Sequence, residues 1–138
     1  MDTIGLRIII ESYKSTIIGD RDSNQDRILS KRINSNLFIS LICDGMGKYE
    51  GGEEAAEISI TTISQYFNQL KDFSNIGIEI YNSIELAHKK IVEISQIDEN
   101  KSMMGTTLAL VIFHLDYFIV ANVGDRRVYL VRNENIFQ

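Results

Sequence analysis

The 138-residue sequence contains no proline, one cysteine and two histidines. Without proline, its turns must be formed by Gly, Asn and Asp. With Cys43 alone, no disulfide can form within the chain, which is compatible with a reducing compartment. Neither His88 nor His114 has a partner at metal-ligand spacing, so we interpret both as structural or exposed.

Long hydrophobic runs and an excess of positive charge are also missing. No apolar stretch approaches the ~20 residues needed to span a bilayer, and the N-terminus lacks the pattern of a signal peptide. The formal net charge is −5, which argues against a general nucleic-acid binder, because such a protein needs a basic face. We therefore expect one soluble, cytoplasmic domain with no nucleic-acid or membrane partner.

What is present is a set of short strand patterns around two helical ones. The run Leu37–Cys43 is apolar on both faces, so we expect it to be covered on both sides. The strands expected from the pattern are Leu6–Ser12, Arg27–Ile33, Leu37–Cys43, a meander of residues 106–113, 117–123 and 126–132, and the opening of a further strand at 136–138.

Two amphipathic helices are predicted between the strands. The first follows Gly51 and Gly52 and carries Glu53 and Glu54 in its first turn, where acidic residues favour the helix dipole. We interpret both apolar stripes as core faces rather than partner surfaces. The stripes are Ala56, Ile60, Ile63, Phe67 and Leu70 in the first helix, and Ile80, Ile84, Ala87, Ile91 and Ile94 in the second.

Asp44 is the most informative residue, because an apolar strand ends there in "CDGMG". A carboxylate beside a glycine, whose backbone can approach an ion closely, suits a hard cation such as Mg²⁺ or Mn²⁺. The Gly45 carbonyl would be a second oxygen ligand. The alternative is that Asp44 only caps a turn.

Two further segments combine acidic residues with arginine. In "RDSNQD", Arg21 could grip a phosphate with its planar fork, and Asp26 could hold metal-bound water. The alternative is a solvated charged loop. In "VGDRR", Asp125 could join the same acidic cluster, or it could pair with Arg126 or Arg127.

The charge balance favours a metal if these carboxylates converge. Two like charges ~4 Å apart repel by roughly 4 kcal/mol at an effective dielectric constant of 20. Divalent ions would remove this repulsion and would lower the pKa of a bound water. Cys43 is not predicted to be a phosphatase nucleophile, because no arginine follows it in a phosphate-binding loop. We expect it to be a buried small hydrophobic residue.

Together, "RDSNQD", "CDGMGKYEGGEEA" and "MGTTLAL…ANVGDRRVYLVR" resemble the PP2C-type (PPM) metal-dependent serine/threonine protein phosphatases, especially bacterial members. The resemblance covers nearly the whole chain. It implies an α+β fold, a four-layer αββα sandwich of two antiparallel sheets flanked by helices. It also implies two Mn²⁺ or Mg²⁺ ions, with a third in some bacterial enzymes, and a metal-bridged hydroxide that attacks the phosphorus.

The resemblance assigns a role to each candidate residue. Asp44 matches the ligand that bridges the metals, and Gly45 matches the backbone carbonyl ligand. Arg21 matches the phosphate-binding arginine. Asp26 matches the acidic residue that supports the metal water, and Asp125 matches a ligand of the more weakly held third metal.

The sequence also departs from the family pattern. Gln25 stands where many members have Glu, Lys48 replaces a usual Gly, and Arg126 replaces a usual Ser. Met46 is typical of bacterial members. The family's C-terminal half, with two further Asp ligands, is not present. We therefore expect residues 1–138 to be the N-terminal part of a single phosphatase domain, and the chain alone to bind metals weakly.

The leading hypothesis is a hydrolase of phosphoserine and phosphothreonine in proteins, whose partners would be phosphorylated substrates and a cognate kinase. The alternative is a non-catalytic phosphoprotein-binding or regulatory domain. An aspartyl-phosphate phosphotransferase is disfavoured, because "CDGMG" lacks the second Asp of a D-x-D motif.

Overall fold

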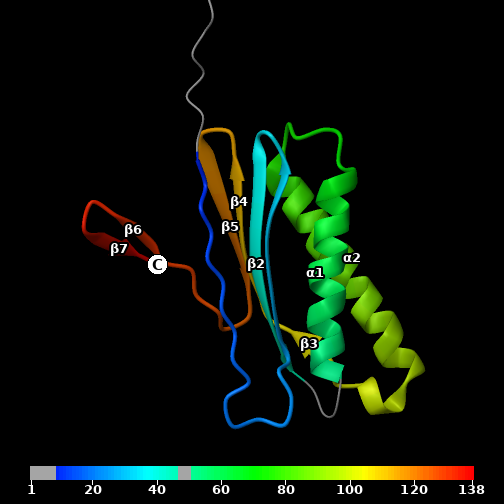
Figure 1. Ribbon diagram of the computed structural model, residues 1–138. Coiled ribbons are helices and arrows are strands. Elements are labelled where there is room, and N and C mark those ends of the chain that lie inside the picture. Colours follow the sequence, from blue (N-terminus) through cyan, green and yellow to red (C-terminus); the bar gives the residue numbers. More distant parts are fainter. Residues whose placement is uncertain (1–8, 47–50) are drawn as a thin grey trace, which may run out of the picture.

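A computed structural model describes residues 9–46 and 51–138 (Figure 1). Within these ranges, two helices follow the first two strands and a second group of strands follows the helices. The elements are β1 (Asp26–Asn34), β2 (Leu37–Met46), α1 (Gly51–Gln69), α2 (Ile76–Ile97), the 3₁₀ helix η1 (Glu99–Lys101), β3 (Gly105–Thr106), β4 (Leu108–His114), β5 (Tyr117–Val123), β6 (Leu130–Arg132) and β7 (Asn135–Phe137).

The main sheet is antiparallel, in the order β1-β2-β4-β5, with the short β3 paired to the end of β2. Leu41 of β2 lies opposite Leu29 on one side and Leu110 on the other. Residues directly opposite each other in antiparallel strands share a face, and successive residues alternate between faces. The register therefore gives one face of the sheet a continuous row of aliphatic side chains.

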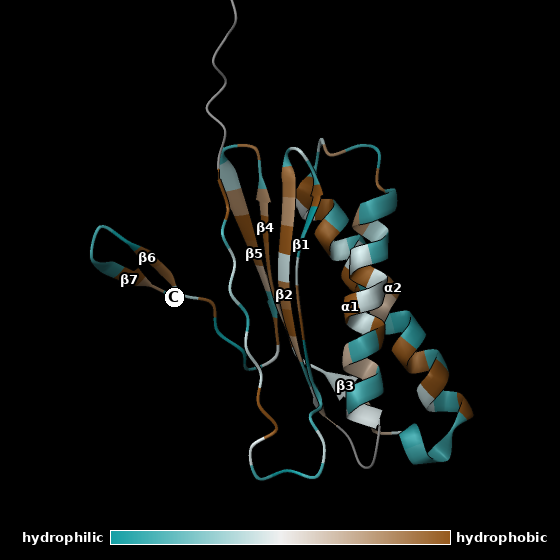
Figure 2. Cartoon of the chain, viewed as in Figure 1, coloured by the Kyte–Doolittle hydropathy of each residue, from teal (hydrophilic) through white to brown (hydrophobic). Residues whose placement is uncertain are grey.

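Both helices cover this aliphatic face (Figure 1). The stripe predicted for α1 is in the core, where Ile63 and Phe67 are buried and Leu70 packs at the margin. The stripe of α2 packs in the same way, with Ile80, Ala87 and Ile91 buried. The predicted helices and their inward faces are confirmed. Figure 2 shows the hydrophobic residues concentrated along β2 and β4.

Local hydrogen bonds fix the ends of α2. The Asn75 side chain accepts a hydrogen bond from the backbone N–H of Ile78 at 3.2 Å, which is the typical geometry of a helix N-cap. At the other end, the Asp98 backbone N–H donates to the Ile94 carbonyl, and the Asp98 side chain accepts from Asn100 to begin η1. One aspartate thus ends one helix and starts the next.

The second face of the main sheet is more open than the sequence predicted. Phe38 is buried, but Ile42 is 43% exposed and Val120 of β5 is 42% exposed. The expectation that β2 is covered on both sides is therefore wrong for the part of the chain that the structure describes. The physical reason is that α1 and α2 both pack on the opposite face (Figure 1).

Two predicted strands differ from the structure. The described part of Leu6–Ser12, residues 9–12, is not a strand, and residues 6–8 lie outside the described ranges. The strand predicted for residues 126–132 is reduced to β6, which pairs with β7 instead of β5. The chain leaves the main sheet because Gly124 has a φ of 97°, and the Asn122 side chain then donates to the Arg126 carbonyl at 2.7 Å.

The hairpin of β6 and β7 projects away from the main sheet (Figure 1). Asn133 and Glu134 join its strands with φ angles of 49° and 64°. Two left-handed residues between paired strands are typical of a type I′ turn, which matches the twist of a hairpin. The strand predicted at the end of the sequence is confirmed. No helix in the described ranges is long and apolar enough to span a membrane.

Candidate functional site

Asp44 lies within β2, directly opposite Asp26 of β1. The strand predicted from the sequence ends at Cys43, but β2 continues through Met46 because Gly45 and Met46 pair with β3. Cys43 faces the helices, so its neighbour Asp44 points to the other face of the sheet, and Asp26 shares that face. The two carboxylates that were predicted to act together therefore lie side by side at one end of the sheet.

Arg126 forms an ion pair with the Asp44 carboxylate. Its Nε also donates to the Thr107 hydroxyl at 3.3 Å and lies 3.5 Å from the Asp125 carboxylate. The alternative in which Asp125 pairs with Arg126 thus describes the observed contact. The Asp125 side chain is 82% exposed, so it reaches Asp44 only through this guanidinium. A single arginine connects two of the predicted acidic site residues.

Thr107 holds the backbone of Asp44 in place. The Thr107 N–H donates to the Asp44 carbonyl at 3.0 Å, and the Thr107 hydroxyl lies within 3.4 Å of both backbone polar atoms of Asp44. Gly124 packs closely on this threonine, because a Cβ added to it would lie 2.8 Å from Thr107 Cγ2. The connection between β5 and β6 therefore packs against Thr107, the residue that positions Asp44.

Gly45 is buried between the loop before β1 and the start of α1. Its N–H donates to the Gln25 carbonyl at 3.1 Å, and an added Cβ would lie only 2.0 Å from the Gly52 carbonyl oxygen. The glycine is thus required for close backbone packing. This packing fixes the end of β2 next to the N-terminus of α1. The predicted role of the Gly45 carbonyl as a metal ligand stays a prediction.

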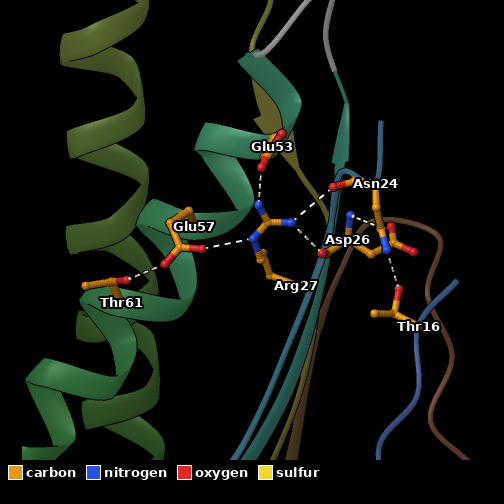
Figure 3. Close-up of polar contacts among 7 residues, drawn as sticks. All are labelled: Thr16, Asn24, Asp26, Arg27, Glu53, Glu57 and Thr61. Carbon is orange, nitrogen blue, oxygen red and sulfur yellow. Dashed lines mark hydrogen bonds and ion pairs between the residues drawn. The ribbon is translucent and has the colours of Figure 1, made fainter. Parts of the chain in front are cut away.

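Arg27 lies on the helix side of the site and connects several of its residues (Figure 3). It was not identified from the sequence. Its side chain pairs with Glu53 and, at 2.9 Å, with Glu57 of α1. Its Nη1 donates to the carbonyls of Asn24 at 3.0 Å and Asp26 at 2.9 Å. Arg27 therefore ties the loop that carries Asp26 to the first turns of α1.

The charge of Arg27 is stabilised by these partners. Burial disfavours the charged guanidinium, but the hydrogen bonds and charges of Glu53 and Glu57 outweigh it and raise the pKa of Arg27. One feature of the sequence could have indicated these ion pairs. Glu53 and Glu57 are one helical turn apart, so they lie on the same side of the helix. Arg27 follows Asp26 in the strand, so its side chain points to the opposite face of the sheet, where the helices pack.

Arg21 lies in an exposed bend before β1. It forms no ion pair with Asp26 or Asp44 in the described structure. The position leaves its guanidinium open to solvent on the loop that leads directly into Asp26. Its role in phosphate binding stays a prediction.

The donor atoms around Asp44 suit a hard divalent cation in kind. Asp26 and Asp44 provide carboxylate oxygens on adjacent strands, and the guanidinium of Arg126 already places a positive charge on Asp44. Among residues 9–46 and 51–138, however, no group of three or more His, Cys, Asp or Glu residues converges. Within the described ranges, these residues therefore supply only part of a full ligand set for such an ion.

The cysteine and the two histidines are buried, exposed or in structural contacts, as the sequence predicted. Cys43 is fully buried on the helix side of β2, and burial raises the pKa of its thiol to about 12 against a weaker lowering by Thr106. A protonated thiol is a poor nucleophile. His88 is exposed on α2. His114 stacks on Phe73, and its Nδ1 lies 2.9 Å from the Tyr117 hydroxyl.

Comparison with known sequences places the chain in a family. The sequence profile of protein phosphatase 2C matches residues 16–138. The chain belongs to the protein phosphatase 2C family. A serine/threonine phosphatase stp of Listeria monocytogenes is 31% identical over 106 residues, which are 75% of this chain and 42% of that protein. Protein phosphatase PhpP of Streptococcus pneumoniae is 26% identical over 126 residues, 89% of this chain and 51% of that protein.

Solved structures of protein phosphatase 2C relatives share the fold. The serine/threonine phosphatase of S. agalactiae superposes with a TM-score of 0.75 at 32% identity, covering 85% of this chain and 49% of that one. Stp1 from Staphylococcus aureus gives 0.76 at 25% identity, with 87% and 48% covered. The chain thus spans about half the length of the relatives it matches. The predicted fold class is confirmed for this portion, which has two antiparallel sheets and a helix pair.

Protein phosphatase 2C enzymes are metal-dependent. The catalytic domain of the serine/threonine protein phosphatase PstP, whose structure contains two manganese ions, has a TM-score of 0.73 to this chain at 22% identity. At that identity the likeness concerns the fold alone. The individual roles of Arg21, Asp26, Asp44, Gly45 and Asp125 stay predictions for this chain.

Proposed function

We propose that the protein carrying this chain removes phosphate from phosphoserine and phosphothreonine in other proteins, with divalent metal ions as cofactors. One observation carries the proposal. In a chain of the protein phosphatase 2C family, Asp26 and Asp44 lie opposite each other at one end of the main sheet. Adjacent carboxylates repel each other and are stabilised by a shared cation.

In the proposed site, the carboxylate of Asp44 and the carbonyl of Gly45 hold the metal pair, and Asp26 orients water beside it. The cofactors would be two Mn²⁺ or Mg²⁺ ions, with Asp125 available to a third. When bound, such ions supply water acidified enough to attack a phosphoester near neutral pH. Thr107 and the Gly45–Gly52 contact keep Asp44 in position, because they fix its backbone on both sides.

Arg21 is assigned to the phosphate group of the substrate. Its planar guanidinium can donate two parallel hydrogen bonds to phosphate oxygens. The exposed position on the loop before Asp26 is compatible with contact to a large protein substrate. Phosphorylated proteins are therefore the proposed partners, together with the serine/threonine kinase that produces them.

We also propose that residues 1–138 form the N-terminal part of one phosphatase domain in the cytoplasm. The length comparison supports this, since the matching relatives are about twice as long. The single, buried cysteine is compatible with a reducing compartment. The remaining metal ligands would then come from residues outside this chain.

The proposal is tested with the whole protein that carries this chain. Hydrolysis of an aryl phosphate and of a phosphothreonine peptide should require Mn²⁺ or Mg²⁺ and stop on addition of a chelator. Asp44→Asn should abolish turnover. Asp116→Asn is the matched control, because this exposed residue lies in the β4–β5 turn at the other end of the sheet. Full activity of Asp44→Asn would refute the assignment.

One specific contact favours a second function, a non-catalytic phosphoprotein-binding domain. Arg126 neutralises Asp44, and no third ligand joins Asp26 and Asp44 among the described residues. A non-catalytic phosphoprotein-binding domain would show saturable binding of a phosphothreonine peptide without any metal-dependent turnover. Turnover that depends on Asp44 would exclude this alternative.

A further inference from the structure

We propose that Arg126 acts as a built-in counter-ion of Asp44, which competes with divalent cations for this carboxylate and so sets the metal affinity of the site. The inference rests on the proposed function, because it assumes that Asp44 binds metal. It concerns a different residue, however, one for which the family pattern has serine.

The guanidinium of Arg126 occupies the position where a metal ion would bind Asp44. Arg126 contacts the Asp44 carboxylate directly, and this carboxylate is only 19% exposed. A metal ion that bound the same oxygen would have to take the place of the guanidinium. Even at the other oxygen of this carboxylate, the ion would be repelled by the nearby guanidinium in a site that is partly shielded from water.

Hydrogen bonds hold Arg126 in place. Its carbonyl accepts a hydrogen bond from Asn122 at 2.7 Å, and its Nε donates to Thr107 at 3.3 Å. Gly124, with a φ of 97°, brings this connection against Thr107. The contact with Asn122 therefore fixes the backbone of Arg126, and the contact with Thr107 keeps its side chain beside Asp44. A surface arginine without such contacts would rotate freely.

The contact between Arg126 and Asp44 can open. The Arg126 side chain is 41% exposed, and residues 126–129 belong to no strand. Asp125, which is 82% exposed and 3.5 Å from Arg126 Nε, offers a second carboxylate in solvent. When a metal ion binds Asp44 and none is bound at Asp125, the guanidinium can move toward Asp125 and keep a partner. The competition is thus reversible. Metal binding at Asp44 has to break about one partly exposed ion pair, the one between Arg126 and Asp44.

Direct measurement of metal binding tests the proposal. The whole protein that carries this chain is titrated with MnCl₂ by calorimetry, as wild type and as Arg126→Ser. Loss of one partly exposed ion pair predicts an affinity for Mn²⁺ that is about fivefold tighter in Arg126→Ser. Arg127→Ser is the matched control. It removes the same charge from the next residue, which forms no ion pair with Asp44 in the described structure, and should shift the affinity by less than about twofold.

The outcomes separate this inference from the proposed function. If Asp44→Asn leaves Mn²⁺ binding unchanged, the metal site itself is wrong, and both proposals fail. If Asp44→Asn weakens binding but Arg126→Ser behaves like Arg127→Ser or binds more weakly than wild type, only the competition is overturned. In the Asp44→Asn background, Arg126→Ser should bring no further gain, because the shared partner is gone.

A second variant covers the possibility that Arg126→Ser does not fold, which circular dichroism would show. Arg126→Gln keeps N–H donors for Thr107 and Asp44 but removes the charge. It should show the same increase of about fivefold in Mn²⁺ affinity, since the proposal attributes the effect to charge. An unchanged affinity in folded Arg126→Gln would overturn the proposal.

Discussion

Gly45 and Gly52 pack backbone against backbone, so closely that a Cβ on Gly45 would lie 2.0 Å from the Gly52 carbonyl oxygen. This contact joins the strand that carries Asp44 to the first turn of α1. Neither backbone can move away easily, because Gly45 is also hydrogen-bonded to Gln25 and paired with β3. The position of Asp44 therefore depends on the absence of a side chain at its neighbour.

Gly45→Ala should destabilise the protein strongly. Forcing a methyl group into a packed contact costs about 1–3 kcal/mol, and we expect the upper part of this range because the clash is with backbone. Urea unfolding measures the loss. Gly77→Ala is the control. Gly77 lies in the first turn of α2, where an added Cβ would be 3.7 Å from the Asn75 side-chain oxygen. The alanine variant should therefore be as stable as wild type or more stable by about 0.5 kcal/mol. Equal stability of the two variants would contradict the packing argument.

Arg27→Met should separate the Asp26 loop from α1. The residue makes four polar contacts, two of them to carboxylates, and its side chain is 27% exposed. With solvent screening taken into account, we expect a loss of about 1–2 kcal/mol in the free energy of unfolding. Arg27→Lys should recover less than half of it, because lysine lacks the planar fork.

The control for Arg27 is Lys31→Met, which removes a positive charge from an exposed position on the same strand. It should change the stability by no more than about 0.5 kcal/mol. Arg27→Met with an effect as small as that of Lys31→Met would show that the contacts to α1 are not energetically coupled to folding.

The sequence allowed most of the main sheet and both helices to be predicted, because their burial follows simple periodicity. Ile63 and Phe67 repeat with the helix turn, and the strands alternate over short ranges. The prediction of a strand beginning at Arg126 was wrong, because periodicity does not report where the backbone turns. The left-handed Gly124 and the side chain of Asn122 turn the chain out of the sheet before the alternating residues can pair.

The candidate site was predictable in part. Motif resemblance singled out Asp26 and Asp44, and the strand register places them opposite each other. The partners of the arginines could not be predicted in the same way. From the sequence, Asp125 could pair with Arg126 or Arg127, and in the structure Arg126 contacts both Asp125 and Asp44. Arg27 finds its partners Glu53 and Glu57 on a helix, 26 and 30 residues later in the sequence. Such choices depend on how elements pack, which local sequence does not determine.

Cys43 should be unreactive in the folded protein and reactive once it unfolds. It is fully buried, and burial raises the pKa of the thiol to about 12, so the thiolate that reacts with disulfide reagents is suppressed. At pH 8, labelling by an aromatic disulfide reagent should follow the unfolding rate and accelerate with urea. Rapid stoichiometric labelling in buffer alone would contradict the buried position.

The same pKa predicts a pH dependence. Since the pKa of Cys43 is higher in the folded state than its ordinary value of 9.0, its contribution to stability is complete below pH 9 and is lost as the pH rises toward 12. The stability difference between wild type and Cys43→Ala should therefore shrink over this range. Comparison with the alanine variant cancels the titration of the other groups. A constant difference would rule out the burial effect.

Asp26→Asn should affect folding and metal binding in opposite directions. Asp26 and Asp44 are directly opposite on one face of the sheet, and like charges in such a pair are destabilising. With chelator present, we expect the variant to be more stable than wild type by about 0.5–1 kcal/mol. With MnCl₂, its affinity should fall by about tenfold or more, because a residue that supports metal-bound water is lost.

Asp22→Asn is the control for Asp26→Asn, since it removes the same charge from an exposed bend four residues earlier. It should leave both quantities nearly unchanged. The stabilising effect of Asp26→Asn should also be larger in an Arg126→Ser background, because Arg126 neutralises part of the repulsion by its contact with Asp44. If Asp26→Asn lowers stability and leaves Mn²⁺ affinity intact, the two carboxylates do not form a common cation site.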